Sequence, residues 1–315
     1  MSNKRIFIYA FVFILLLILS SCKKEFVSRD DKSITFTDAL GREVSVSHNP
    51  RRVAALIGSF ADVWTLAGGS LCATAEDAWT DFGLELDDAI NIGGAHSPSI
   101  ELLISSSPDF VIASASTASN VEMKDSLESM GITVAYFDVD SFENYLDMLC
   151  VCTNITGRRD LYEKNGLDIK EQIDEIKLRY QEEDIPDEHR RVLLLRASSG
   201  AVKAKGSHGT ILGEMLSDMG CINVADSDKS LLDNLTAESV IRENPYHIFV
   251  VTMGNNTDAA KSKLENMIKE NPVWSSLDAV KNGRLYVMDK TLFNMKPNER
   301  WADAYEILYE KLTKK

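Results

Sequence analysis

The sequence of 315 residues lacks a hydrophobic run long enough to span a membrane comfortably. The longest apolar stretch covers residues 6–19, and it stands directly behind Lys4 and Arg5. A basic start, a short apolar segment and small residues before a cleavage site are typical of a secretory signal rather than of a membrane-spanning helix. We therefore expect residues 1–21 to be a lipoprotein signal peptide that is removed on export.

Cysteine is scarce, and none of the five forms a Cys-x-x-Cys pair with zinc-ligand spacing. The first, Cys22, follows Leu-Ser-Ser at residues 19–21, which fits the lipobox of bacterial lipoproteins, in which this cysteine is diacylated and becomes the N-terminus. A plain signal peptide with an incidental cysteine is the alternative. The others are expected to be buried free thiols: Cys72, Cys150, Cys152 and Cys221.

Basic residues are outnumbered, with 34 Lys and Arg against 48 Asp and Glu. Loss of Lys4 and Arg5 with the signal leaves 32 basic residues against 48 acidic ones, a net charge of −16. An acidic surface of this kind repels phosphate backbones. Nucleic acid is therefore not expected as a partner.

The motifs of common enzymes are also missing: there is no Gly-x-Ser-x-Gly, no His-Glu-x-x-His and no Walker loop. Among five scattered histidines, only His96 lies in a loop expected at a cleft, and a transition-metal site usually needs three or four donors. At Ser207-His208 we expect a hairpin turn between Lys205 and Thr210 rather than a Ser–His relay. The chain is not expected to be an enzyme; an exported hydrolase and a binder of bare metal ions stay as remote alternatives.

What the chain does contain is one pattern repeated in its two halves. Each copy has a glutamate, Glu101 or Glu238, on a short amphipathic helix and a proline seven positions later, Pro108 or Pro245. The proline ends the helix, and a β-branched apolar run follows it. The repeat predicts two similarly built lobes with one carboxylate at the matching place on each, as suits a binding protein that docks with both ends.

Alternating apolar runs and helical patterns predict an α/β fold of two Rossmann-like βα lobes joined by a long α-helix. Residues 22–33 are charged and without pattern, and we expect them to be a tether. The N-terminal lobe is placed at 34–140 and the C-terminal lobe at 190–315. Between them, residues 141–185 have no strand signal and are expected to be the linking helix, a stiff spine with one apolar stripe: Ile169, Ile173, Ile176 and Tyr180.

The expected elements follow from local patterns. A hairpin around Asp38–Gly41 opens the first lobe. Buried parallel strands are expected at residues 52–58, 109–113, 132–137, 191–196, 248–252 and 284–288. Helices outside the spine are expected at 61–67, 210–219, 259–270 and 298–312.

Ligands of open parallel sheets gather outside the carboxyl ends of the strands. The residues at those ends mix aromatic, hydroxyl and basic groups, which suits a large, partly apolar and partly anionic ligand held between two lobes. The candidate ligand-binding residues of the first lobe are Ser59, Phe60, Trp79, His96, Ser114 and Ser116. Those of the second lobe are Arg196, Met253, Asn255, Lys290 and Phe293.

From Ile34 onward the chain resembles the substrate-binding proteins of ABC importers that take up iron–siderophores, haem and corrinoids, which are periplasmic binding proteins with a helical backbone. The resemblance rests on segments that follow the family's order: 37–53, 92–112, 235–245 and 271–287. It implies a lipid-anchored monomer without a cofactor at the cell membrane, facing the periplasm or the exterior. Such a protein captures a small-molecule metal chelate and delivers it to a permease dimer with its ATPase.

The resemblance also implies roles for particular residues. In that family one surface glutamate per lobe pairs with arginines of the permease, and the matching positions are Glu101 and Glu238. Arg196 stands where siderophore-binding relatives often keep an arginine for an anionic iron chelate. Trp79 and Phe293 suit stacking on a corrin or porphyrin instead. Iron–siderophore is the first expected ligand, corrinoid the second and haem the third.

One position departs from the family's pattern. Asp62 stands where a glutamate is frequent. We expect it to cap its helix or to compensate the helix dipole.

Overall fold

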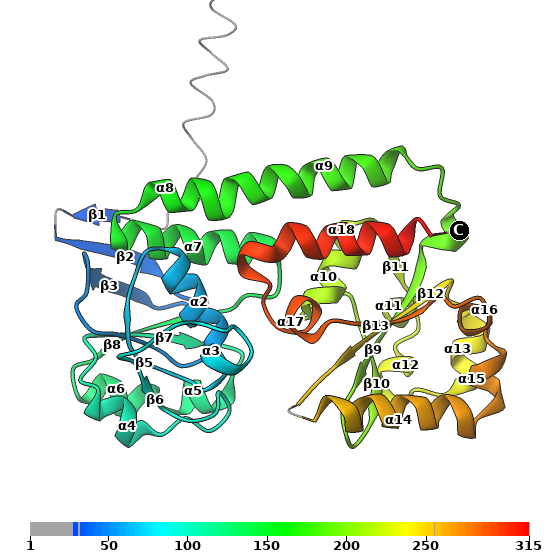
Figure 1. The fold of residues 1–315 in the computed structure, drawn as a ribbon, viewed down its shortest axis with the longest axis horizontal. Helices are drawn as coiled ribbons and strands as arrows, with labels where there is room; N and C mark the ends of the chain where they lie inside the picture. Colours follow the sequence, from blue (N-terminus) through cyan, green and yellow to red (C-terminus); the bar gives the residue numbers. More distant parts are fainter. Residues whose placement is uncertain (1–27, 31, 255, 315) are drawn as a thin grey trace, which may run out of the picture.

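The computed structural model describes residues 28–30, 32–254 and 256–314. The signal segment, Cys22, part of the expected tether and the candidate residue Asn255 lie outside the described residues. Figure 1 shows two α/β lobes side by side, joined along one side by helices. The predicted fold class, two α/β lobes with parallel sheets, is confirmed.

The N-terminal lobe contains a parallel sheet with the strand order β6-β5-β4-β7-β8. All residues of its central strands are buried, which explains why these strands are almost continuously apolar in sequence. The strands are β4 (Val53–Ala55), β5 (Leu71–Thr74), β6 (Ile90–Asn91), β7 (Phe110–Ser114) and β8 (Thr133–Phe137). The helices are α2 (Gly58–Leu66), α3 (Asp77–Thr80), α4 (Ile100–Ser105), α5 (Ala118–Glu122) and α6 (Lys124–Ser129).

The predicted hairpin is formed by β2 (Ser33–Thr37) and β3 (Glu43–Ser47). The Asp38 carboxylate holds its turn by accepting hydrogen bonds from the backbone N–H groups of Leu40 and Arg42, both at 3.0 Å. Residues Ser28–Asp30, expected to belong to the tether, form β1 and pair antiparallel with β2.

The segment between the lobes is helical, but residues 141–185 do not form one helix. The first part, α7 (Phe142–Thr156), ends at Gly157, whose φ of 72° lies in the left-handed region that glycine adopts without strain. The chain continues as α8 (Arg159–Tyr162), the π-helical turn η2 (Glu163–Leu167) and α9 (Asp168–Glu182). Only this second part crosses over both lobes, while α7 lies beneath it on the N-terminal lobe (Figure 1). The predicted apolar stripe is the buried face of α9.

The C-terminal lobe has the strand order β10-β9-β12-β13, with β11 (Ile222–Asn223) also pairing with β9. Strands β9 (Arg191–Ala197), β12 (His247–Thr252) and β13 (Leu285–Met288) are parallel. Strand β10 (Val202–Lys205), which the sequence analysis missed, is antiparallel to β9. The expected hairpin turn between Lys205 and Thr210 is therefore wrong, because this loop leads from β10 into α10 (Ile211–Asp218).

The remaining helices surround this second sheet, except that α18 runs along the spine. They are η3 (Asp187–Arg190), α11 (Val224–Ser227), α12 (Ser230–Asp233), α13 (Ala237–Glu243), α14 (Thr257–Glu270), α15 (Pro272–Ser276), α16 (Asp278–Lys281), α17 (Lys290–Phe293), η4 (Asn298–Arg300) and α18 (Trp301–Leu312).

One apolar core runs through both lobes on the helical side. Trp301, at the start of α18, is 0% exposed, and its ring centre lies 5.8 Å from that of Phe142 and 6.5 Å from that of Tyr145 on α7. Burial of one such side chain contributes roughly 1.5–3 kcal/mol, so apolar packing holds the lobes together here. No described helix is long and apolar enough to cross a membrane. The described cysteines form no disulfide with one another. Cys150 and Cys152 are buried, as expected, whereas Cys72 and Cys221 are only partly buried, so the expectation of burial is wrong for these two.

Candidate ligand-binding cleft

The cleft expected between the lobes has its N-terminal side at the carboxyl ends of β4 and β7. After β4, helix α2 opens with Ser59 and Phe60, which are only 4% and 0% exposed. At the end of β7, the hydroxyl of the buried Ser114 lies 3.1 Å from the hydroxyl of the exposed Ser116. Of these four candidates, Ser116 is open to solvent. Ser59, Phe60 and Ser114 are buried and pack beneath the surface.

Helix α3 brings a carboxylate to the same side. Asp77 Oδ1 accepts a hydrogen bond from the Gly58 N–H at 2.9 Å. The two helices are so close that a Cβ atom at Gly58 would lie 2.4 Å from the Ala78 backbone nitrogen, so only glycine fits. Burial raises the pKa of Asp77, while the Gly58 hydrogen bond and the charge of His96 oppose that rise. His96 is exposed in its loop, and Trp79 is half-buried against the core.

The C-terminal lobe contributes a cation cluster, which we define as Arg196, Lys205 and Lys296. The Arg196 Nε is buried without a hydrogen-bond partner among the described residues, and burial lowers the pKa of this guanidinium. The pKa of Lys205, at the end of β10, is lowered by burial and by the Arg196 charge. Burial also lowers the pKa of Lys296, with Arg196 acting in the same direction. Across the described part of the chain, none of the three is within ion-pair distance of a carboxylate.

Aspartates of the N-terminal lobe face this cluster. Asp77, Asp138 and Asp140 attract the Lys296 ammonium and oppose the lowering of its pKa. Asp138 and Asp140 follow directly after β8, at the same edge of the sheet as the other N-terminal candidates. The cleft therefore has an acidic wall on one lobe and a basic wall on the other, and the basic wall is the one that attracts an anion.

Two polar contacts cross between the lobes at the cleft. The Lys290 ammonium, at the start of α17, lies 3.6 Å from Asp81 Oδ2. The Asn298 side chain donates from Nδ2 to the Ser59 carbonyl oxygen at 2.9 Å and to Asp62 Oδ2 at 2.7 Å. The expectation that Asp62 caps its helix is wrong, because α2 begins before it, at Gly58, and the carboxyl is buried against Asn298.

The other candidates of the second lobe differ in exposure. Met253, just after β12, is 44% exposed, whereas Phe293 is 2% exposed and belongs to the core, so its ring offers no open face for a macrocycle. The sequence analysis missed Asp77, Lys205 and Lys296. Lys296 left only a weak local signal, since it stands beside Pro297 in a segment between two expected elements that also contains Lys290.

The helices that carry the repeated glutamates, α4 and α13, begin alike. Ser99 and Thr236 cap them, each accepting a backbone hydrogen bond at its side-chain oxygen, so each glutamate is the second residue after its cap. Glu101 and Glu238 are exposed, and neither forms an ion pair with a described residue. The Glu101 pKa is lowered by its own backbone N–H and by the Ser99 hydroxyl, which donates to Oε2 at 2.9 Å.

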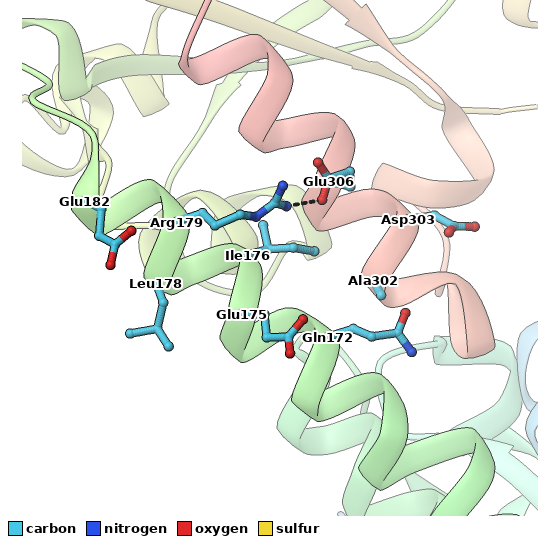
Figure 2. Close-up of a pocket in the computed structure, with 9 residues that line it drawn as sticks. All are labelled: Gln172, Glu175, Ile176, Leu178, Arg179, Glu182, Ala302, Asp303 and Glu306. Atoms are coloured by element: carbon cyan, nitrogen blue, oxygen red, sulfur yellow. Dashed lines mark hydrogen bonds and ion pairs between the residues drawn. The ribbon is translucent and has the colours of Figure 1, made fainter.

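A groove of about 710 Å³ lies elsewhere, between α9 and α18 (Figure 2). Its Arg179 pairs with Glu306 across the two helices, and Leu178 points outward and is 59% exposed. The other charged lining residues are acidic: Glu175, Glu182 and Asp303. Because these carboxylates repel anions, the groove is not a candidate for an anionic ligand.

A metal site or a Ser–His relay would bring several donor or reacting side chains together among the described residues. No three His, Cys, Asp or Glu side chains among them come together as the ligands of one metal ion would. In the loop before α10, His208 Nδ1 lies 3.1 Å from Glu214 Oε1, and the Ser207 N–H donates to Asp226 Oδ1 at 3.0 Å.

A model of the family described as periplasmic binding protein matches residues 53–292. The uncharacterized ABC transporter substrate-binding lipoprotein YvrC of Bacillus subtilis (strain 168) is 22% identical, with 98% of each chain covered. The Fe(3+)-citrate-binding protein YfmC of the same organism is 25% identical over 92% of this chain and 90% of its own. The crystal structure of Staphylococcus aureus SirA complexed with staphyloferrin B has a TM-score of 0.68 at 19% identity, covering 88% of this chain and 98% of that chain, which establishes the shared fold.

Proposed function

The chain belongs to the periplasmic binding protein family, and from this premise we propose that it captures an anionic ferric chelate between its lobes and delivers it to an ABC importer. It carries out no chemistry of its own. Capture is followed by docking on the permease dimer and by release, which the importer's ATPase drives. The observation that carries the ligand class is the cation cluster of Arg196, Lys205 and Lys296.

A cation that is partly buried without a counter-ion costs free energy, and such groups persist where they serve binding. The planar Arg196 guanidinium suits carboxylate or catecholate oxygens, and each charge-assisted hydrogen bond contributes about 1.5–3 kcal/mol. Around the cluster, His96, Ser116 and Lys290 complete the proposed site, together with Trp79 and Met253. Asn255, a candidate from the sequence, stays a prediction because it lies outside the described residues. A hydroxycarboxylate chelate of iron fits this set, and YfmC is named for a ligand of that class.

Docking is proposed to use Glu101 and Glu238. Both carboxylates are exposed and unpaired among the described residues, so they are available to arginines of a permease. Leu102 and Ile241, on the same two helices, are 44% and 45% exposed. Rim charges set the orientation and rate of association, and exposed aliphatic side chains beside them add a desolvated contact.

The location follows from Cys22. Diacylation of this cysteine would hold a monomer at the cell membrane, facing the periplasm or the exterior. The relative YvrC is named as a lipoprotein.

A tryptophan-fluorescence titration separates the ligand classes. The full chain, kept in solution with a mild detergent, is titrated with ferric citrate, a ferric catecholate siderophore, cobinamide, haemin and zinc chloride, with absorbance corrections. We expect saturable quenching at sub-micromolar concentration by a ferric chelate, because Trp79 lies at the cleft. Saturation only by cobinamide or haemin would replace the chelate by a macrocycle, and saturation only by zinc would favour a metal-ion binder. Failure of every probe with folded protein would refute the proposal.

A further inference from the structure

Asp62 and Asn298 form the buried polar contact between the lobes. Asp62 lies within α2 of the N-terminal lobe and is 9% exposed; Asn298 opens η4, just before α18, and is 0% exposed. The Asn298 amide donates both to Asp62 Oδ2 at 2.7 Å and to the Ser59 carbonyl oxygen at 2.9 Å. One side chain from the second lobe therefore holds the turn of the first lobe that carries Ser59 and Phe60.

The pair is short of hydrogen-bond donors. Asn298 Oδ1 is buried without a hydrogen-bond partner among the described residues. An ionised Asp62 offers only acceptors, whereas a protonated Asp62 carries an O–H donor. Asn298 also has a φ of 55°, in the left-handed region that asparagine adopts more readily than most residues. The backbone conformation therefore favours an asparagine at this position.

The acidic groups around Asp62 favour the proton. Burial raises the pKa of Asp62 to about 7, Glu299 on η4 acts in the same direction, and the Asn298 hydrogen bond opposes them. From α7, Tyr145 faces the same region, and its own pKa is raised by burial, by Glu299 and by Asp62. Helix α3, which also packs on α2, carries Asp77, whose carboxylate accepts the Gly58 N–H. The strands beneath α2, namely β4, β5 and β7, carry no charged residue.

The cations of this region face other groups. Lys296 lies over the Phe60 ring but is attracted by Asp138 and Asp140. Arg300 Nε lies 3.4 Å from Asp303 Oδ2. Asp62 has no ion pair among the described residues, so its carboxylate form has no counter-charge.

We propose that Asp62 and Asn298 form a proton-dependent lock between the lobes, which is tight while Asp62 carries its proton and loosens when Asp62 ionises. The lock does not depend on the identity of the ligand. An exposed aspartate has the ordinary pKa of 3.8. At a pH where Asp62 is protonated while the lobes are joined but would ionise once exposed, separation of the lobes therefore releases a proton. The contact is therefore strongest in acid, weakens about tenfold per pH unit up to a pH of about 7, and stays at its weakest above that.

The matched variant is Asp62→Asn, which has the size of the acid and keeps one donor and one acceptor at every pH. The full chain is unfolded by urea in a mild detergent from pH 5 to pH 8. The ratio of the wild-type to the variant unfolding constant should rise by roughly 50-fold between pH 5 and pH 7 and level off near roughly 100-fold by pH 8. The infrared band of a protonated carboxyl group should fade in the wild type near pH 7 and be missing in the variant. Parallel pH profiles, or a wild type without this band, would overturn the proposal.

Two exposed positions test the mechanism even if Asp62→Asn does not fold. Glu299→Gln removes a charge that raises the Asp62 pKa, so the carboxyl band should fade at lower pH than in the wild type. Glu310→Gln makes the same change at an exposed acid of α18 that has no ion pair among the described residues, and this control should leave the band unchanged. A Glu299→Gln midpoint equal to that of the control would overturn the assignment of the band to Asp62.

Discussion

Replacing Lys296 with methionine should strengthen the fold and weaken ligand binding at the same time. The ammonium is half-buried, its Nζ lies 5.8 Å from the centre of the Phe60 ring, and burial lowers its pKa despite the attraction of Asp138 and Asp140. Methionine is flexible, apolar and of similar length, so Lys296→Met removes the cost of desolvating the charge. We expect the free energy of unfolding to rise by about 0.5–2 kcal/mol, the usual gain of a stabilising substitution.

Ligand affinity should change in the opposite direction. Lys296→Met removes one charge-assisted contact of about 1.5–3 kcal/mol from the proposed anion site. That loss corresponds to a dissociation constant roughly 10- to 150-fold higher. Urea unfolding measures the first effect, and fluorescence titration with whichever probe saturates the wild type measures the second.

Lys311→Met is the matched control for this prediction. Lys311 Nζ lies 5.7 Å from the centre of the Tyr286 ring, so Lys311 resembles Lys296 in its ring contact. Lys311 lies in the last turn of α18, whereas Lys296 precedes the first. The control should leave affinity unchanged. Equal affinity in Lys296→Met and the wild type, or an equal loss in both variants, would refute the role of Lys296 in anion binding.

Two further predictions concern docking and the core. Replacing both Glu101 and Glu238 with arginine should abolish uptake by cells while leaving ligand affinity intact. Glu265→Arg, at an exposed position on α14, is the control. Unchanged uptake in the double variant would rule out these glutamates as the docking residues. Trp301→Ala should lower the free energy of unfolding by about 3–5 kcal/mol, because the ring is fully buried against Phe142. A loss below about 1 kcal/mol in urea unfolding would mean that the lobes do not share one cooperative core.

The local signals of the sequence predicted most of the elements. Continuous apolar runs marked the buried strands of both sheets, and the period of the stripe on α9 marked the face that packs on α18. The repeat at Glu101 and Glu238 corresponds to two helices with the same kind of cap. A long helix does join the lobes, as predicted, but residues 141–185 were predicted as one helix because they have no strand signal. The separation of α7 from α8 and α9 depends on the left-handed backbone angle of Gly157.

The site was harder to predict, because its parts come from distant places in the chain. Arg196 was found since it follows the general rule for strand ends. Asn298 reaches Ser59 and Asp62 over separations of 239 and 236 residues, and nothing near either partner in sequence marks the contact. The lowered pKa of Lys296 likewise depends on burial by both lobes.

The two sides of the lobe interface differ in chemistry, and this difference determines how the cleft opens. On the spine side, large aromatic side chains such as Trp301 are packed in a shared core, and separating them costs several kcal/mol. On the cleft side, the described polar contacts include the Lys290–Asp81 pair, which contributes about 0.2–1 kcal/mol, and the Asn298–Asp62 hydrogen bond, whose contribution depends on pH under the proposed lock. We expect the polar contacts to break before the aromatic core does, so that the lobes part by a small rotation about this core. On this expectation a ligand needs to supply only a few kcal/mol to set the closed state, and under the proposed lock the protonation of Asp62 would adjust that amount.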